Sequence, residues 1–493
     1  MVDRQEDVAP SDGKGIVNVP LKVFYDAVVV GSGPNGLAAA ITLARAGRSV
    51  LVLEAKSTVG GGMRSAAFTL PGFLHDVCSS IHPLGLASPF FKSLDLPSLG
   101  VDWVHSPAAT AHPLDDGTAV LLERSMETTA DSLGPDGRNY LKNIGPLVAG
   151  WDDLVEDVLG PFRFPHHPWL YGRFGVVAGR SIHRFITANF RTVQARAFLA
   201  GLSAHSIMPT GSPGGAAYGL LLAAAGHAVG WPVVSGGSRR IAEALKKCLV
   251  DSGGEVQTDT IVHSLDELPR SRSVLLDVTP HQLAEIAGRQ FPARYRQYLV
   301  NYRYGPGVYK LDWAMDGPIP WKTSSCSRAA TVHLGGTFEE IAEAEDAVWR
   351  GEHPDRPFVI LGQQSLFDRS LAPTGKQSAW AYCHVPNGSG VDVSSRIEAQ
   401  VERFAPGFRS RILARHVMTT HDMEAYNPNY VGGDIAGGRQ EPFRILFRPL
   451  GHWRPYATPA RGVYVCSASM PPGAGVHGMC GHYAARRVIR DGL

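Results

Sequence analysis

The first part of the chain alternates short apolar runs with one helical stripe. Ala27–Val30 is a continuous, mostly β-branched run, which is typical of a buried parallel strand. Leu37–Ala46 carries apolar residues along one face and predicts a helix. Ser49–Leu53 is a second buried run that ends at Glu54. This order of strand, helix and strand predicts a βαβ unit with a parallel sheet.

A second pair of elements follows in the middle of the chain. Ile241, Leu245 and Leu249 recur at helical spacing, and the glycine pair that follows predicts the end of that helix. Glu255–Val262 then alternates as a strand does. This pair could add a parallel strand to the first sheet, or it could be an unrelated helix and strand.

Strand-like runs dominate the region after residue 300. They are expected to form a mixed or antiparallel sheet with helices on one face, and they are Val308–Trp313, Thr331–Leu334, Phe358–Leu361 and Trp380–His384. Lys310 and Asp312 share one face of the first run, which predicts an ion pair at a sheet edge or, alternatively, part of a cavity wall.

The most apolar stretch is Ala216–Trp231. It is shorter than the ~20 residues that a membrane crossing needs, and it contains three glycines and a histidine. We expect a buried helix here. The alternative is a patch that touches a membrane surface or lines the tunnel of an apolar substrate.

Composition narrows the class of protein. The chain has 493 residues, of which 44% are hydrophobic and 19% charged, with a net charge of +2, so two domains or one elaborated globular domain are expected. The interspersed charges make nucleic acid an unlikely partner. Residues 1–21 are expected to be a disordered lead-in, without the pattern of a secretory signal. The six scattered cysteines contain no C-x-x-C pair, so we expect no metal site, reduced thiols and a cytoplasmic location.

The predicted βαβ unit contains a dinucleotide-binding glycine loop. Gly31 would make the tight turn, Gly33 would let the backbone approach a diphosphate, and Gly36 would permit close packing of helix and strand. The helix N-terminus offers unpaired N–H groups and a positive dipole end to the phosphates. Glu54 would accept hydrogen bonds from the ribose hydroxyls and repel a 2′-phosphate. The loop therefore predicts FAD or NAD rather than NADP, with a glycine turn that binds nothing as the alternative.

Two further glycine clusters favour FAD. Gly60–Gly62 is followed at once by Met63 and Arg64, which would place main chain and a guanidinium beside a further phosphate or a flavin ring. The C-terminal segment PPGAGVHGMCG repeats the G-x-G-x-x-G spacing at Gly473 to Gly478. Only fifteen residues follow Gly478, too few for a second βαβ unit.

These motifs together resemble a known family. The first glycine loop, GGGMRS, GGEVQTDTIV and PPGAGVHGMCG are similar, in the same order, to the flavin-binding segments of the phytoene-desaturase-related FAD-dependent oxidoreductases, a branch of the amine-oxidase-like flavoprotein superfamily. GPGVYKLDWAMDGPIPW, HVPNGSG and NPNYVGGDI resemble the subgroup that contains pyridine nucleotide-disulfide oxidoreductase domain-containing protein 2. The resemblance covers residues 25–493.

The resemblance implies an α/β fold. A discontinuous Rossmann-type FAD-binding domain would comprise residues 22–105, 230–300 and 430–493, and an inserted α+β substrate domain residues 106–229 and 301–429. The terminal loop would return to the nucleotide domain and point its helix N-terminus at the pyrimidine end of the flavin. The residues expected to bind FAD are Gly31, Gly33, Pro34, Asn35, Gly36, Glu54, Ala55, Lys56, Gly61, Gly62, Met63, Arg64, Val262, Ser467, Gly475, Val476 and His477.

The resemblance also implies dehydrogenation or desaturation of a largely apolar small molecule by hydride transfer to the flavin, with oxygen or a quinone as electron acceptor. The alternatives are an amine oxidase that produces hydrogen peroxide, a flavin-bound protein kept for its interactions, and a plain NAD dehydrogenase. His82 and His477 are the candidate catalytic residues, as proton acceptors; a structural role is the alternative for each. Peripheral contact with a membrane is a further expectation, and the oligomeric state stays open.

Overall fold

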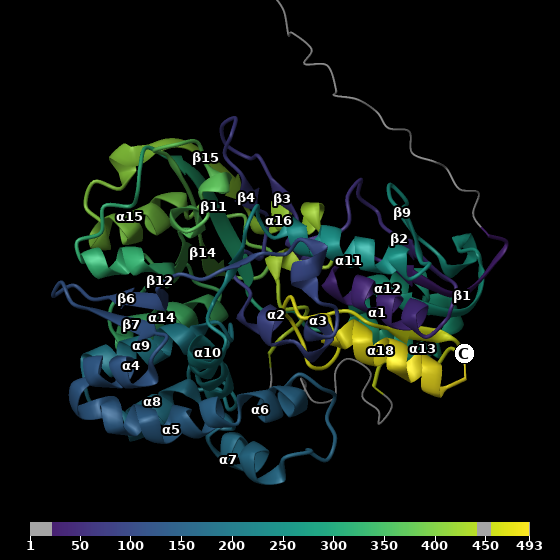
Figure 1. Cartoon of the computed structure of the whole chain (residues 1–493), viewed down its shortest axis with the longest axis horizontal. Coiled ribbons are helices and arrows are strands. Elements are labelled where there is room, and N and C mark those ends of the chain that lie inside the picture. The colour runs from purple at the N-terminus through teal and green to yellow at the C-terminus, as the bar shows by residue number, and fades with distance from the viewer. Residues whose placement is uncertain (1–21, 441–454, 493) are drawn as a thin grey trace, which may run out of the picture.

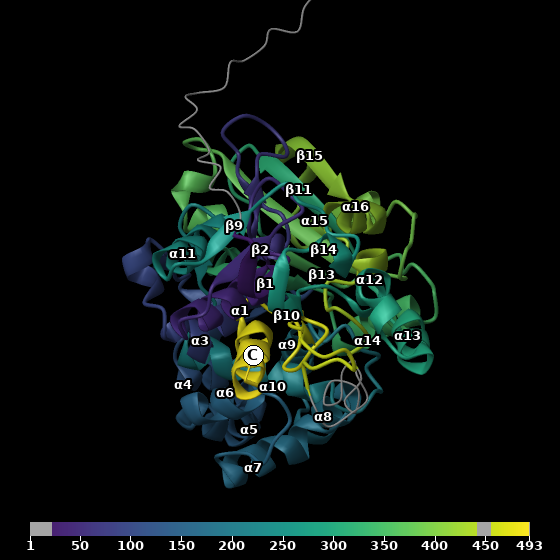
Figure 2. The same cartoon turned by 90° about the vertical axis from the view of Figure 1, so that its right-hand side faces the viewer.

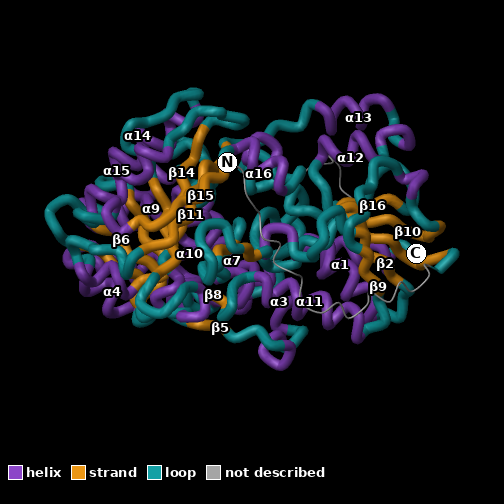
Figure 3. The backbone as a smooth tube through the Cα atoms, turned by 90° about the horizontal axis from the view of Figure 1, so that it is seen from above, coloured by secondary structure: helices purple, strands orange, loops and turns teal. Residues whose placement is uncertain are grey.

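The computed structural model of the chain describes residues 22–440 and 455–492. Two sheets lie at opposite ends of the molecule, a parallel one on the right of Figure 1 and a mixed one on the left, and the view from above separates them clearly (Figure 3). The predicted lead-in at residues 1–21 lies outside the described residues.

The parallel sheet has five strands in the order β16-β10-β1-β2-β9. β1 (Phe24–Val30) and β2 (Val50–Leu53) flank helix α1 (Pro34–Arg45), which confirms the predicted βαβ unit. β9 (Glu255–Gln257) pairs in parallel with β2, so the second pair of elements does extend the first sheet. The strand ends at residue 257, however, and does not reach Val262.

The inner strand β10 (Arg270–Leu276) was not predicted from the sequence. Its first half is polar and partly exposed, and only its last residues form an apolar run. β10 pairs with β1 on one side and with β16 (Val463–Val465) on the other. Because Val30 aligns with both Leu53 and Leu276, the residues that follow these strands meet at one edge of the sheet.

Helices close around this sheet. α18 (Met479–Arg490) lies beside α1, and a Cβ added to Gly481 would be 1.7 Å from the carbonyl oxygen of Asn35. Only glycine permits this approach, which brings the C-terminal helix onto the nucleotide loop (Figure 2). The other elements on this side are α2 (Pro83–Ala87), α3 (Pro89–Lys92), α11 (Arg239–Asp251), α12 (Pro280–Ile286), α13 (Ala293–Val300) and the two-stranded pairs β3 (Ser65–Ala66) with β4 (His75–Asp76) and β5 (Trp103–Val104) with β8 (Val233–Val234).

The mixed sheet has seven strands in the order β15-β11-β14-β13-β12-β6-β7. All neighbours are antiparallel except β12 and β6, which are parallel. The four predicted strands are all present, and the full set is β6 (Ala108–Pro113), β7 (Ala119–Glu123), β11 (Gly307–Met315), β12 (Ala329–Leu334), β13 (Val359–Gly362), β14 (Gln377–Val385) and β15 (Ile412–Met418).

Helices cover both faces of this sheet, so the expectation of helices on one face is wrong. Along β14, Ala379 and Ala381 pack in the core that includes α15 (Ser394–Phe404), whereas Trp380 belongs to the core that includes α14 (Phe338–Trp349). Because successive side chains of a strand point to opposite faces of the sheet, β14 contributes residues to two separate cores. A short helix, α16 (Thr420–Tyr426), follows β15.

A helical layer lies below the mixed sheet in Figure 1. The most apolar stretch of the sequence, Ala216–Trp231, contains the buried helix α10 (Ala216–Ala228), as expected. In the part of the chain that the structure describes, no helix combines the length and hydropathy needed to span a bilayer. The other helices of this layer are α4 (Met126–Ser132), α5 (Gly137–Ala149), α6 (Trp151–Val158), α7 (Pro168–Ala178), α8 (Ile182–Asn189) and α9 (Val193–Ala204).

Lys310 and Asp312 do form an ion pair, with 2.5 Å between Nζ and Oδ1. The pair does not lie at a sheet edge: β11 is an interior strand and both side chains are almost fully buried. Lys310 Nζ also donates to the carbonyl oxygen of Asp76, which ties the mixed sheet to the β3–β4 pair. Neither side chain is among the residues that line the large cavity described below.

Candidate functional site

The first glycine loop joins β1 to α1, and its geometry requires glycine. Gly31 has φ +98°, and a Cβ added to Gly36 would be 2.1 Å from the carbonyl oxygen of Gly31. Pro34 occupies the first turn of α1, where its missing N–H has no cost. The loop therefore brings the N-terminus of α1 against the end of the parallel sheet, as a diphosphate site requires.

Glu54 follows β2 and is only 6% exposed. Its Oε2 accepts hydrogen bonds from the backbone N–H and the hydroxyl of Ser32, and its Oε1 accepts from the N–H of Lys56 and from Arg64 Nη2, both at 2.9 Å. A carboxylate offers about four acceptor positions. A ribose hydroxyl would therefore take the place of one of these donors, and Ser32 Oγ and Arg64 are the two side chains that can yield.

Arg64 lies at this ribose end. Its guanidinium pairs with Glu54, donates to the carbonyl oxygen of Thr58, and lies 5.7 Å from the centre of the Tyr426 ring. The adjacent Gly61 contributes its carbonyl oxygen to the Tyr426 hydroxyl. The N–H of Gly60 donates to the carbonyl oxygen of Ser32 at 3.0 Å, so the second glycine cluster packs against the first loop.

A second carboxyl group, Asp277, stands in the glycine loop itself. Its Oδ2 accepts the backbone N–H of Gly36 at 3.0 Å, and it lies 2.9 Å from the position that a Cβ on Gly33 would take. Burial, together with the nearby charge of Glu54, raises the pKa of Asp277 to about 7, against the opposing effect of the Gly36 hydrogen bond. Asn429 donates to the backbone carbonyl of Asp277.

The terminal loop runs from β16 to α18. Gly475 has φ +140° and Gly478, which precedes α18, has φ +70°, so both need glycine's freedom. The Nδ1 of His477 accepts the N–H of Met479 at 3.0 Å and thereby satisfies the first turn of α18. His477 is buried, and burial lowers its pKa to about 4. These contacts favour the structural role for His477.

His82 is also held by protein groups. Ser238 Oγ donates to the carbonyl oxygen of Ser79 at 2.6 Å, so it accepts from His82 Nε2, 2.8 Å away. The imidazole therefore carries its proton on Nε2, and burial lowers its pKa to about 3. His82 does line the cavity, with its Nδ1 3.4 Å from Ser79 Oγ.

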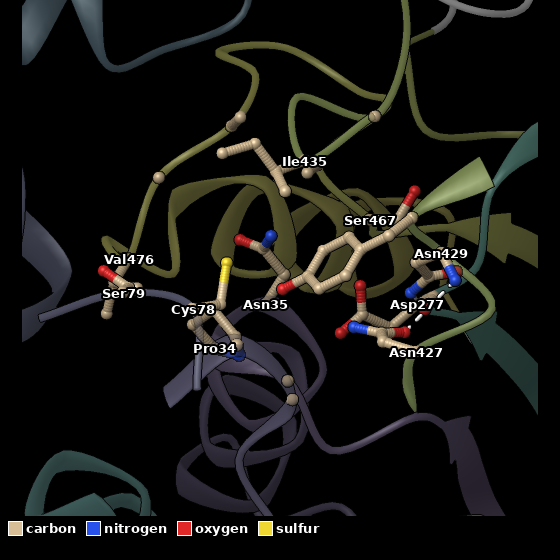
Figure 4. Close-up of a pocket in the computed structure, with 18 of the residues that line it drawn as sticks. Pro34, Asn35, Cys78, Ser79, Asp277, Asn427, Asn429, Ile435, Ser467 and Val476 are labelled. Carbon is tan, nitrogen blue, oxygen red and sulfur yellow. Dashed lines mark hydrogen bonds between the residues drawn. The ribbon is translucent and has the colours of Figure 1, made fainter. Parts of the chain in front are cut away.

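One cavity of about 500 Å³ joins both glycine loops. Figure 4 shows side chains from distant segments around it, with Pro34 and Cys78 near the lower centre, Asp277 and Ser467 on the right and Val476 on the left. Three predicted FAD ligands are not among its lining residues: Gly36, Met63 and His477. The predicted residues that do line it are Gly31, Gly33, Pro34, Asn35, Glu54, Ala55, Lys56, Gly61, Gly62, Arg64, Val262, Ser467, Gly475 and Val476.

Comparisons with known proteins agree with this architecture. Residues 29–94 match the NAD(P)-binding Rossmann-like domain. Pyridine nucleotide-disulfide oxidoreductase domain-containing protein 2 from Rattus norvegicus is 25% identical, over 96% of this chain and 94% of the relative. Phytoene desaturase (neurosporene-forming) from Rhodobacter capsulatus is 26% identical over 92% of each. Wild-type putrescine oxidase bound to putrescine shares the fold, with a TM-score of 0.60 and 18% identity over 95% of this chain and 98% of that one.

Over most of its length the chain is therefore similar to a phytoene desaturase and to pyridine nucleotide-disulfide oxidoreductase domain-containing protein 2, and it shares the fold of an amine oxidase. This confirms the resemblance inferred from the sequence and the expectation of a Rossmann-type α/β oxidoreductase. The first loop, Glu54 and the terminal loop surround one cavity, which is the arrangement that the resemblance implied.

The opposite end of the cavity was predicted only in part, through the alternative that Ala216–Trp231 lines the tunnel of an apolar substrate. It is lined by His205, which follows α9, by Tyr218 and Leu222 of α10, and by Trp380 and Tyr382 of β14, whose rings stack at 6.0 Å. These residues come from segments far apart in the sequence, and their spacing carries no motif. Asp277, by contrast, had a detectable signal: like Glu54, it is an acid directly after an apolar run.

Glu54 provides a test of the ribose end. Glu54→Gln is expected to weaken FAD binding about tenfold, because an amide oxygen accepts a hydrogen bond less strongly than a carboxylate and no longer pairs with Arg64. The measurement is a fluorescence titration of the apoprotein with FAD. Glu255→Gln on β9 is the matched control, since Glu255 pairs with Lys22 outside the cavity. Unchanged affinity in Glu54→Gln would remove Glu54 from the cofactor site.

Proposed function

We propose that this chain is an FAD-dependent dehydrogenase or desaturase that acts on a largely apolar small molecule. The observation that carries the proposal is the continuity of the cavity: a wall of glycine loops passes directly into a wall of aliphatic and aromatic side chains. The similar proteins favour the oxidoreductase class, and one of them is a phytoene desaturase.

The dinucleotide end fits FAD in its main features. A Cβ on Gly31 would lie 3.1 Å from Asp277 Cβ, and one on Gly33 would lie 2.9 Å from Asp277 Oδ2, so this close approach of loop and carboxyl group needs glycine at both positions. Pro34 and Asn35 in the first turn of α1 line the cavity, and the buried Asn35 Oδ1 has no hydrogen-bond partner among the described residues. Gly31, Gly33 and Asn35 would hold the diphosphate, Glu54 the ribose, and the backbone N–H groups near Gly475 the pyrimidine end. Bound FAD would supply a two-electron hydride acceptor.

The apolar end favours an uncharged substrate. Both carboxyl side chains among the described lining residues, Glu54 and Asp277, belong to the dinucleotide end. His205 stays neutral there, because burial lowers its pKa to about 3. Its Nε2 lies 2.9 Å from Nε2 of His333, which fixes the ring. The chain would thus exclude water around the reacting carbon and place a substrate oxygen, where one exists, against His205.

The first test is the visible spectrum of the purified protein and the identity of the cofactor that denaturation releases. We expect a yellow protein that yields FAD. Anaerobic mixing with apolar alcohols and alkenes should then bleach the flavin absorbance, whereas a panel of primary amines should not. Reoxidation by oxygen, with peroxide as product, and by a quinone is followed in the same preparation.

Each contrary result points to another function. A colourless protein that also fails to take up FAD would contradict the cofactor assignment and favour a nicotinamide enzyme. Bleaching by amines with release of peroxide would favour an amine oxidase. A flavin that no reductant in a broad metabolite panel bleaches would favour a flavin-bound interaction protein.

A further inference from the structure

The helical layer carries an unbalanced positive charge. After Asp157, no aspartate or glutamate occurs until Glu243, although eight arginines lie between them. Among the described residues, none of the first six of these arginines forms a salt bridge; they are Arg163, Arg173, Arg180, Arg184, Arg191 and Arg196. The chain as a whole has a net charge of only +2, so this segment is locally basic.

Within this segment, helix α7 exposes large apolar side chains. Phe164, just before the helix, is 84% exposed, and Trp169 and Val176 on the helix are 92% and 68% exposed. Trp169, Arg173 and Val176 follow each other at i, i+4 and i+7, so they share one face. The opposite face is buried through Phe174 and Ala178. We call Phe164, Trp169, Arg173 and Val176 the α7 patch.

The α7 patch lies at the outer edge of the helical layer. α7 forms the lower rim of the molecule in both Figure 1 and Figure 2. Its inner side packs against α10, the helix that contributes Tyr218 and Leu222 to the cavity wall. One helix therefore separates the α7 patch from the apolar end of the cavity.

We propose that the α7 patch docks this protein on the surface of a membrane that contains anionic lipids. Aromatic side chains such as Trp169 and Phe164 favour the boundary between headgroups and acyl chains, and arginines around them attract anionic headgroups. The proposal goes beyond the proposed function, because binding to a membrane requires no turnover. It also provides a source for an apolar substrate within one helix of the cavity.

The charges argue against a second copy of the chain as the occupant. A two-fold symmetric contact through α7 would bring the arginine-bearing segments of both copies into one interface. The nearest acidic residues, on α6, already contact other side chains: Asp152 pairs with Lys92, Asp153 lies 3.4 Å from His167, and Glu156 lies 3.3 Å from His166. A lipid surface with scattered negative charge has no such conflict.

The test is co-sedimentation of the full-length protein with vesicles of phosphatidylcholine alone and of phosphatidylcholine with 30% phosphatidylglycerol, about a third anionic lipid. We expect binding to the anionic vesicles that weakens as salt is raised, since exposed charges are screened. Trp169→Ser combined with Phe164→Ser should reduce the partition at least about tenfold. Arg173→Glu with Arg184→Glu should remove the preference for anionic vesicles.

Matched controls keep the result specific. Leu413→Ser removes an exposed apolar side chain from the mixed sheet, and Lys246→Glu reverses an exposed charge on α11; neither should change the partition. The absorbance ratio of flavin to protein, measured on every variant, separates failure of this proposal from failure of the proposed function. Equal partition of all variants, or no binding of the parent protein to either vesicle, would overturn the proposal. So would a dimer in solution that Trp169→Ser dissociates without any vesicle binding.

Discussion

Replacing Gly36 with alanine is expected to leave the purified protein without bound FAD. The new Cβ would lie 2.1 Å from the carbonyl oxygen of Gly31 and 3.2 Å from Asp277 Oδ2, and the first of these contacts is with backbone that cannot rotate away. The first turn of α1 would have to move off the end of β1. Because that turn supplies the N–H groups of the diphosphate site, the strain falls on the binding geometry itself.

The expected loss follows from the typical cost of inserting a methyl group into a packed site, about 1–3 kcal/mol. That energy corresponds to a loss of about 5- to 150-fold in affinity. The flavin-to-protein absorbance ratio after purification and a titration of the apoprotein with FAD measure it. Gly211→Ala serves as the control, since a Cβ at Gly211 meets nothing within 4 Å. Normal flavin content in Gly36→Ala would show that the cofactor does not use this loop.

The parts of this fold that the sequence predicted are those with a local cause. The strand β1, the helix α1 and the end of β2 at Glu54 follow from apolar periodicity and glycine spacing within thirty residues. The burial of the Lys310–Asp312 ion pair has no local cause. The sequence shows that the two residues share one face of a strand, but β11 is an interior strand only because β15, about a hundred residues later, pairs with its other edge.

The site divides in the same way. The two glycine loops and Glu54 could be predicted because each is defined by residue spacing within a short segment of the sequence. His477 was also predicted as a site residue. Its structural role, however, follows from the hydrogen bond that its Nδ1 accepts from the N–H of Met479, which the sequence does not show. The pair His205–His333 depends on the packing of the end of α9 against β12, and no spacing in the sequence encodes that contact. Asp277 was not predicted because β10, the strand that ends directly before it, has a polar first half and therefore lacks the apolar pattern of a buried strand.

Asp277 leads to the second large effect, a dependence of FAD affinity on pH. The carboxyl group bonds to Gly36 N–H, in the loop where a diphosphate with negative charge would bind. With a pKa of about 7, Asp277 is neutral at pH 6 and ionised at pH 9. If FAD binds only the neutral form, the affinity is nearly constant below pH 6 and approaches a tenfold fall for each pH unit above pH 7, which amounts to about 100-fold between pH 6 and pH 9.

Asp277→Asn should abolish this dependence and bind FAD at pH 9 as tightly as the parent protein binds it at pH 6. The amide oxygen can still accept the Gly36 N–H, so the loop keeps its shape while the charge is lost. The two buried histidines near the loops do not interfere, since the pKa of His82 is lowered to about 3 and that of His477 to about 4. The measurement is a titration of both proteins with FAD from pH 6 to pH 9. If the affinity of the parent protein does not change over that range, Asp277 either stays in one protonation state or lies away from the phosphates.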